Sequence, residues 1–156
     1  VFNIFFWMSL IGQLSIQLFF TFVLTEFSRS HTPKGQIDVN NEEEFVPTFM
    51  NSTMFLFNLA SMFATSVFNY EGRPFMLSLS ENTKHFKYIV APIALIIALG
   101  LNLLPDLSEL FQMALSDISF NVLCQLTGIV SLFIVLEFCW TVFVRYLTFG
   151  KIEKLI

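Results

Sequence analysis

Glu137 is the only ionisable residue well inside an apolar stretch of this sequence. The stretch runs from Phe120 to Val144, and by helical rise Glu137 lies about 10 Å from Arg145. A charged, unpaired acid at that depth in hydrocarbon costs several kcal/mol, so the side chain must be protonated, paired or close to water. Two hypotheses follow: Glu137 contacts a polar or cationic substrate or carries a proton, or it makes a structural hydrogen bond to a neighbouring helix.

Amide and hydroxyl side chains recur on one face of two further apolar stretches. Along residues 1–24 they fall within about a third of the helical circumference, and from residue 48 onward within a narrower arc. The first set is Asn3, Ser9, Gln13, Gln17 and Thr21, and the second is Asn51, Asn58, Ser61, Thr65 and Asn69. Polar groups are costly against lipid, so both faces should either join helices by hydrogen bonds or line a substrate path.

The remaining reactive side chains form no recognisable site. His31 and His85 fall in different predicted loops on opposite sides of the membrane. Cys124 and Cys139 lie about 22 Å apart on one predicted helix, too far for a disulfide, and should be packing residues. No phosphate-binding glycine loop, zinc motif or nucleophile with its base is present in the sequence. We therefore expect no catalytic residue and no metal site in this segment.

The composition is that of a membrane protein. Hydrophobic residues make up 55% of the 156 residues, charged residues only 13%, and 21 residues are phenylalanine. A soluble domain would hold roughly 25% charged residues. The net charge of -4 and the scattered basic residues exclude nucleic-acid binding. The sequence begins at Val1, is apolar from the start and lacks a signal peptide, so we expect it to be part of a longer protein.

Four stretches are long and apolar enough to cross a bilayer, which takes roughly 20 helical residues. They cover 1–24, 48–68, 86–104 and 120–144. The sequence therefore predicts an all-α membrane protein with a four-helix transmembrane bundle as a single membrane domain over 1–156. Small residues four positions apart, Ala60 with Ala64 and Ala94 with Ala98, favour close helix packing.

Lysine and arginine set the expected orientation, because cytoplasmic loops retain them. The first connection holds Arg29 and Lys34, and the third holds neither residue type. The middle connection, the helix start that follows it and the tail hold the rest, which are Arg73, Lys84, Lys87, Arg145, Lys151 and Lys154. Both chain ends are therefore predicted to face the cytosol, with loops 25–47 and 105–119 in the lumen and loop 69–85 and tail 145–156 in the cytosol.

Two polar motifs flank the second stretch. The first contains Phe45, Pro47, Thr48, Asn51, Ser52 and Thr53, and the second contains Asn69, Tyr70, Gly72, Pro74 and Phe75, followed by Glu81 and Asn82. Glycine permits positive φ and proline fixes φ, so Gly72 and Pro74 should shape a cytosolic turn.

These motifs resemble the C-terminal membrane region of type V, subfamily A, P-type ATPases. In that family the eighth span opens with Phe-x-Pro-Ser/Thr-x-x-Asn-Ser-Thr, and the following cytosolic loop reads Asn-Tyr-x-Gly-x-Pro-Phe and then Glu-Asn. The resemblance covers most of residues 45–150. Residues 1–24 agree with the family's seventh span only in hydropathy and in their first residues, and the loop Thr32–Gly35 does not align with the family. It implies that the four stretches are spans seven to ten of a larger ATPase membrane domain. In that family, span seven begins and span ten ends in the cytosol, as the lysine and arginine count predicts for this chain.

The resemblance further implies a multi-pass endoplasmic reticulum ATPase that dislocates mistargeted transmembrane helices. ATP and Mg, and every catalytic residue, would lie in the parent protein outside this segment. The partners would be the lipid bilayer, the remaining spans and cytosolic domains of the same ATPase, and transmembrane-helix substrates. These four spans would act as a scaffold, with Gln13, Gln17, Asn58 and Glu137 as intramembrane polar residues.

Other interpretations stay open. A free-standing four-span adaptor or assembly subunit fits the composition and topology equally well. A subfamily B, polyamine-type pump shares the Gly-x-Pro-Phe pattern but lacks the Asn-Ser-Thr and Asn-Tyr patterns. A secondary transporter would show an inverted repeat with broken helices, and the sequence shows neither. The substrate, any counter-transported ion and the charge of Glu137 are not determined by the sequence.

Overall fold

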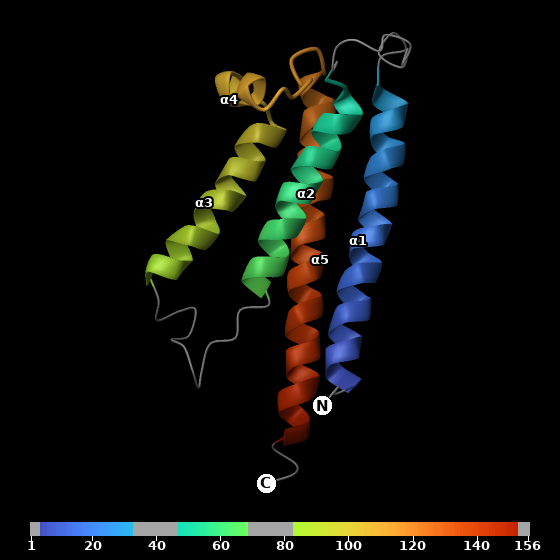
Figure 1. The fold of residues 1–156 in the computed structure, drawn as a ribbon, viewed down its shortest axis with the longest axis vertical. Helices are drawn as coiled ribbons and strands as arrows, with labels where there is room; N and C mark the ends of the chain where they lie inside the picture. Colours follow the sequence, from blue (N-terminus) through green and yellow to red (C-terminus); the bar gives the residue numbers. More distant parts are fainter. Residues whose placement is uncertain (1–3, 33–46, 69–82, 153–156) are drawn as a thin grey trace.

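The computed structural model describes residues 4–32, 47–68 and 83–152. Every regular element in these residues is a helix: α1 (Ile4–His31), α2 (Phe49–Phe68), α3 (Thr83–Gly100), α4 (Pro105–Leu110) and α5 (Phe120–Ile152). The predicted all-α class is confirmed. The four long helices alternate in direction, so the start of α1 and the end of α5 lie at one end of the molecule, here called the terminal end (Figure 1). The opposite end, which carries α4, is called the α4 end.

Each predicted span overlaps one long helix, but the helices and the spans do not share bounds. Helices α1 and α5 continue past residues 24 and 144 to His31 and Ile152. Within the described residues, two stretches are long and apolar enough to cross a membrane, Phe6–His31 and Phe120–Thr148, and α3 adds a shorter apolar stretch, Lys87–Gly100. In α2 the apolar residues are interrupted by asparagine, serine and threonine. The assignment of all four helices to the bilayer stays a prediction.

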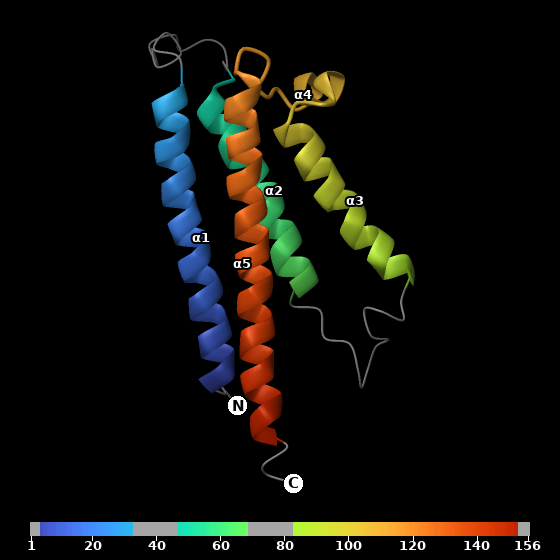
Figure 2. The same cartoon turned by 180° about the vertical axis from the view of Figure 1, so that it is seen from behind.

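Helix α5 is the centre of the bundle and packs against α1, α2 and α3. Figures 1 and 2 show α1 and α2 running along it, whereas α3 diverges from it toward the terminal end. The fully buried ring of Phe133 lies 5.5 Å from the ring of Phe20 in α1 and 4.9 Å from that of Phe57 in α2, measured between centroids. Three helices therefore meet at one aromatic contact.

The outer surfaces of α1 and α5 carry large apolar side chains. Exposed examples are Leu10, Leu14, Leu18 and Phe22 on α1, and Leu132, Val135, Phe138 and Val142 on α5. Cys124 and Cys139 are unpaired, as predicted, but both are exposed on α5, so the expected packing role is wrong. Exposed apolar surface of this extent suits lipid better than water.

The predicted lumenal loop 105–119 contains the short helix α4, which sequence analysis did not anticipate. Both α3 and α4 end in the same hydrogen-bonded turn. Asn102 and Gln112 adopt a left-handed φ of 52°, and the amides that follow them, Leu103 and Met113, donate to the carbonyls of Ala98 and Ser108 over 2.8 Å. Such turns satisfy carbonyls at a helix end. They direct the chain from α3 through α4 back to α5.

Candidate functional site

The predicted polar face of α1 contacts both α5 and α2. The Gln13 Nε2 donates to Thr141 Oγ1 over 3.3 Å, and Thr141 Oγ1 donates to the backbone oxygen of Glu137 over 2.9 Å. One helical turn further along α1, the Gln17 Nε2 donates to Thr65 Oγ1 of α2 over 3.5 Å. Interhelical hydrogen bonds of this kind are each worth about 0.6–2 kcal/mol in a bilayer.

Gly12 lets α1 approach α5 closely beside these bonds. A Cβ added at Gly12 would overlap the indole ring of Trp140. Only glycine therefore fits here, and the Trp140 ring fills the space that a side chain would occupy. This pair could not be predicted from the sequence, because a single glycine in an apolar stretch does not indicate which residue it faces.

The Glu137 side chain is enclosed by the described helices and is only 2% exposed. Among the described residues no hydrogen-bond partner is found for its Oε1, and none for the indole nitrogen of Trp140 one turn along α5. A buried polar atom without a partner costs about 1–3 kcal/mol. The backbone oxygen of Glu137 thus takes part in the Gln13 and Thr141 contact, whereas its side-chain Oε1 has no hydrogen-bond partner in the described residues. Its proposed roles stay hypotheses.

Part of the first motif forms a junction at the α4 end. Thr48 precedes α2, and its Oγ1 accepts a bond from the Asn51 amide over 3.2 Å, which satisfies one free donor of the first turn. The Ser52 hydroxyl accepts a bond of 2.8 Å from the Ala114 amide and donates to the Thr48 carbonyl over 3.1 Å. Ser52 therefore fixes the segment between α4 and α5 to the start of α2. The neighbouring Thr53 is buried.

Two predicted polar residues of α2 face outward. Asn51 and Asn58 are exposed, and within the described residues neither side chain makes a hydrogen bond. Pro47 is half-buried just before α2. The other motif positions lie outside the described residues: Phe45, Asn69, Tyr70, Gly72, Pro74, Phe75, Glu81 and Asn82.

Arg145 links α5 to the end of α2. Its Nη2 donates to the backbone oxygen of Phe68, the last residue of α2, over 2.8 Å. A cation at a helix C-terminus also favours the partial negative charge there. The sequence indicated only that Arg145 ends an apolar stretch. Its contact with α2 depends on the packing of two helices.

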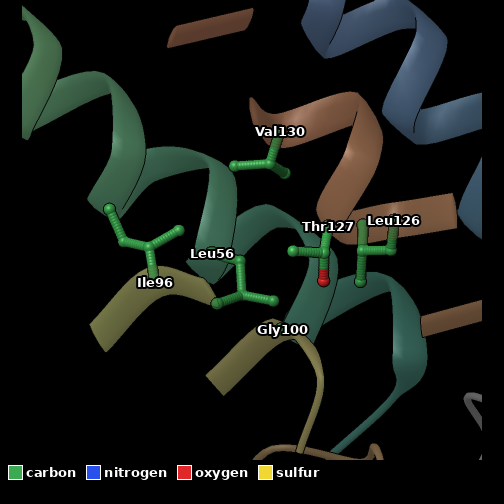
Figure 3. Close-up of a pocket in the computed structure, with 6 residues that line it drawn as sticks. All are labelled: Leu56, Ile96, Gly100, Leu126, Thr127 and Val130. Carbon is green, nitrogen blue, oxygen red and sulfur yellow. The ribbon is translucent and has the colours of Figure 1, made fainter. Parts of the chain in front are cut away.

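A second close approach lies between α3 and α5, near the α4 end. Figure 3 shows Leu56, Ile96, Leu126, Thr127 and Val130 around Gly100, at a small space without room for a water molecule. A Cβ at Gly100 would lie 2.6 Å from the Thr127 hydroxyl oxygen. This site is a packing contact. No cluster of metal-binding side chains is found in the part of the chain that the structure describes.

The fold and its contacts define a helical membrane segment joined by polar and close-packed contacts. No family model matches the chain. It is 28% identical to the endoplasmic reticulum transmembrane helix translocase spfA of Aspergillus fumigatus, over 91% of the chain and 10% of that protein. It is 24% identical to the endoplasmic reticulum transmembrane helix translocase of Saccharomyces cerevisiae, over 85% of the chain and 11% of that protein.

A plant relative carries a different name. The chain is 26% identical to the probable manganese-transporting ATPase PDR2 of Arabidopsis thaliana, over 99% of the chain and 13% of that protein. The chain thus spans about a tenth of the length of the curated relatives it matches. The resemblance to type V, subfamily A, ATPases is confirmed by these relatives, and the expected endoplasmic reticulum location agrees with the names of the two fungal relatives.

Proposed function

We propose that this chain is the C-terminal membrane segment of an ATP-driven P-type ATPase that dislocates transmembrane helices from the endoplasmic reticulum membrane. The observation that carries the proposal is similarity over 85–91% of the chain to two proteins named as such translocases, of which the chain covers about a tenth. The parent protein would bind ATP and Mg and form the aspartyl phosphate outside these residues.

The segment's own contribution is to hold helices in fixed positions. The α1–α5 pair combines the Gly12–Trp140 contact with the Gln13–Thr141 hydrogen bond. Helix α2 is tied at its start by Ser52 and at its end by Arg145. Ties at both ends of a helix resist tilting and sliding. Such a scaffold would anchor the spans that move during the ATP cycle.

Manganese transport is the second candidate function, favoured by the name of the Arabidopsis relative. The two candidates differ in what stimulates ATP hydrolysis. A helix translocase responds to a hydrophobic helix with a polar flank, whereas an ion pump responds to the free ion.

The test is ATP hydrolysis by the full-length protein, purified and reconstituted in lipid. Vanadate-sensitive hydrolysis that rises with a reconstituted transmembrane peptide supports the translocase. Stimulation by micromolar Mn²⁺ with no response to the peptide supports the ion pump. A native gene product of about 18 kDa without hydrolysis would support the adaptor interpretation instead.

A further inference from the structure

Four exposed apolar side chains border the short helix α4. Leu103 and Leu104 lie just before it, and Leu110 and Phe111 lie at its end; together we call them the α4 rim. Leu110 is 74% exposed. Sequence analysis placed loop 105–119 in the lumen, where such side chains would contact water. The depth of α4 relative to the bilayer therefore decides what covers the rim.

Side chains of α1 indicate where the hydrocarbon begins and ends. Trp7 near the terminal end is exposed, as is Tyr146 of α5, and both residue types favour the membrane interface. Toward the α4 end, Glu26 and Arg29 form an exposed ion pair, 3.9 Å between Oε1 and Nη1, which belongs in water or among headgroups. The helical rise from Trp7 to Glu26 is about 28 Å, close to the thickness of the hydrocarbon. The hydrocarbon therefore ends near Glu26.

The same level can be followed across the bundle to the end of α3. Phe20 of α1 contacts Phe133 of α5. From this contact, Glu26 and Thr127 each lie about 9 Å further toward the α4 end along their own helices. Thr127 in turn lies beside Gly100, the last residue of α3 (Figure 3). Helix α3 thus ends at the edge of the hydrocarbon, and Figures 1 and 2 show α4 level with the last turns of α1.

The side chains of α4 separate into an apolar and an acidic face. At 100° per residue, Leu107, Leu110 and Phe111 fall within about 100° of arc, the width of an apolar helix face. Asp106 and Glu109 are exposed and fall outside this arc. A helix with these two faces suits the boundary between hydrocarbon and water.

Two contacts with α2 hold the apolar face toward the bilayer. The Phe111 ring lies 5.3 Å from the ring of Phe55, measured between centroids, and Phe55 lies about 9 Å along α2 from its start. The Ala114 amide donates to Ser52 Oγ over 2.8 Å. These contacts direct Phe111 toward the hydrocarbon and leave Leu110 exposed beside it.

We propose that α4 is an interfacial helix that lies on the lipid leaflet at the α4 end, with the α4 rim among the upper acyl chains and Asp106 and Glu109 in water. The acyl chains are the part of the lipid that fits, because the sequence holds no lysine or arginine from residue 88 to residue 144 to bind a phosphate. This inference depends on the membrane class of the chain and not on the ATP-driven reaction proposed above.

The test is fluorescence quenching of the full-length protein in phosphatidylcholine nanodiscs, which leave both faces open to solvent. An environment-sensitive fluorescent amino acid replaces Leu110 in one variant and the neighbouring Glu109 in the control. We expect a lipid nitroxide near the headgroup to quench position 110 about threefold more than position 109, and aqueous iodide to quench position 109 more. A probe at Leu103 repeats the measurement with a second variant, and each variant is used only if it keeps the melting temperature of the unchanged protein.

Three results would overturn the proposal. Strong iodide quenching and weak nitroxide quenching at position 110 would place α4 in water. Protection of position 110 from both quenchers would show that protein covers the rim. Stronger quenching by a nitroxide at the end of the acyl chain than by one near the headgroup would place α4 inside the hydrocarbon. None of these measurements requires ATP hydrolysis, so failure of this inference is distinct from failure of the proposed function.

Discussion

At the scale of single residues, the α1–α5 contact depends on a side chain that is absent at Gly12. The Trp140 ring occupies the space where a Cβ would lie. Trp140 is large and is held among packed helices, so it has little freedom to move away. A second glycine on α5, Gly128, has no atom within 4 Å of the position that its Cβ would take. The two glycines therefore form a matched pair for substitution.

Gly12→Ala should destabilise the protein by about 1–3 kcal/mol, the usual effect of an added methyl group in a packed interior. Gly128→Ala should be neutral or stabilising by up to about 1 kcal/mol, because alanine favours a helix more than glycine does. The measurement is the melting temperature of each full-length variant in detergent. Equal melting temperatures for the two variants would contradict the described contact between α1 and α5.

Glu137 is enclosed by the described helices, which favours a structural role over direct substrate contact. We expect Glu137→Gln, which has nearly the same shape, to retain normal abundance and ATP hydrolysis within about twofold. Glu137→Lys should reduce abundance strongly, because an unpaired charge is buried at high cost. Loss of hydrolysis in Glu137→Gln at unchanged abundance would instead support a role in carrying a proton or contacting the substrate.

At the scale of elements, the first motif acts through backbone hydrogen bonds at the start of α2. Ser52→Ala removes the acceptor of the Ala114 amide and should cost about 1–3 kcal/mol. Ser66 provides the control, because its exposed hydroxyl bonds only to the Met62 carbonyl in the same helix. Ser66→Ala should change stability by less than about 0.5 kcal/mol. Proteolysis of the α4 end in membranes would report the difference, and equal protection of both variants would contradict the account.

The long helices could be predicted because an apolar stretch of about 20 residues in a bilayer must satisfy its backbone hydrogen bonds internally, which a helix does. The short helix α4 could not, since six residues give no periodic signal and its end depends on a left-handed Gln112. A helical wheel placed Gln13 and Gln17 on one face but could not tell that Gln13 contacts α5 and Gln17 contacts α2. The outward direction of Asn58 was also unpredictable, because it depends on which helices surround α2.

At the scale of the whole molecule, the described helices leave many large apolar side chains exposed. Polar contacts join α1, α2 and α5, whereas α3 diverges from α5 toward the terminal end and large apolar side chains are exposed on α1 and α5. The length of the relatives points the same way, since the chain covers only about a tenth of each of them. The central claim is therefore that these helices belong to a much longer P-type ATPase.

The most direct test is phosphoenzyme formation by the native polypeptide that carries this segment. Microsomes are incubated with radiolabelled ATP and Mg, quenched in acid, and the protein is captured with an antibody raised against the tail, residues 145–156. If these helices belong to such an ATPase, the captured polypeptide is far larger than 18.0 kDa and carries label that hydroxylamine removes and vanadate prevents. Capture of a full-length product that takes up no label under these conditions would contradict the claim.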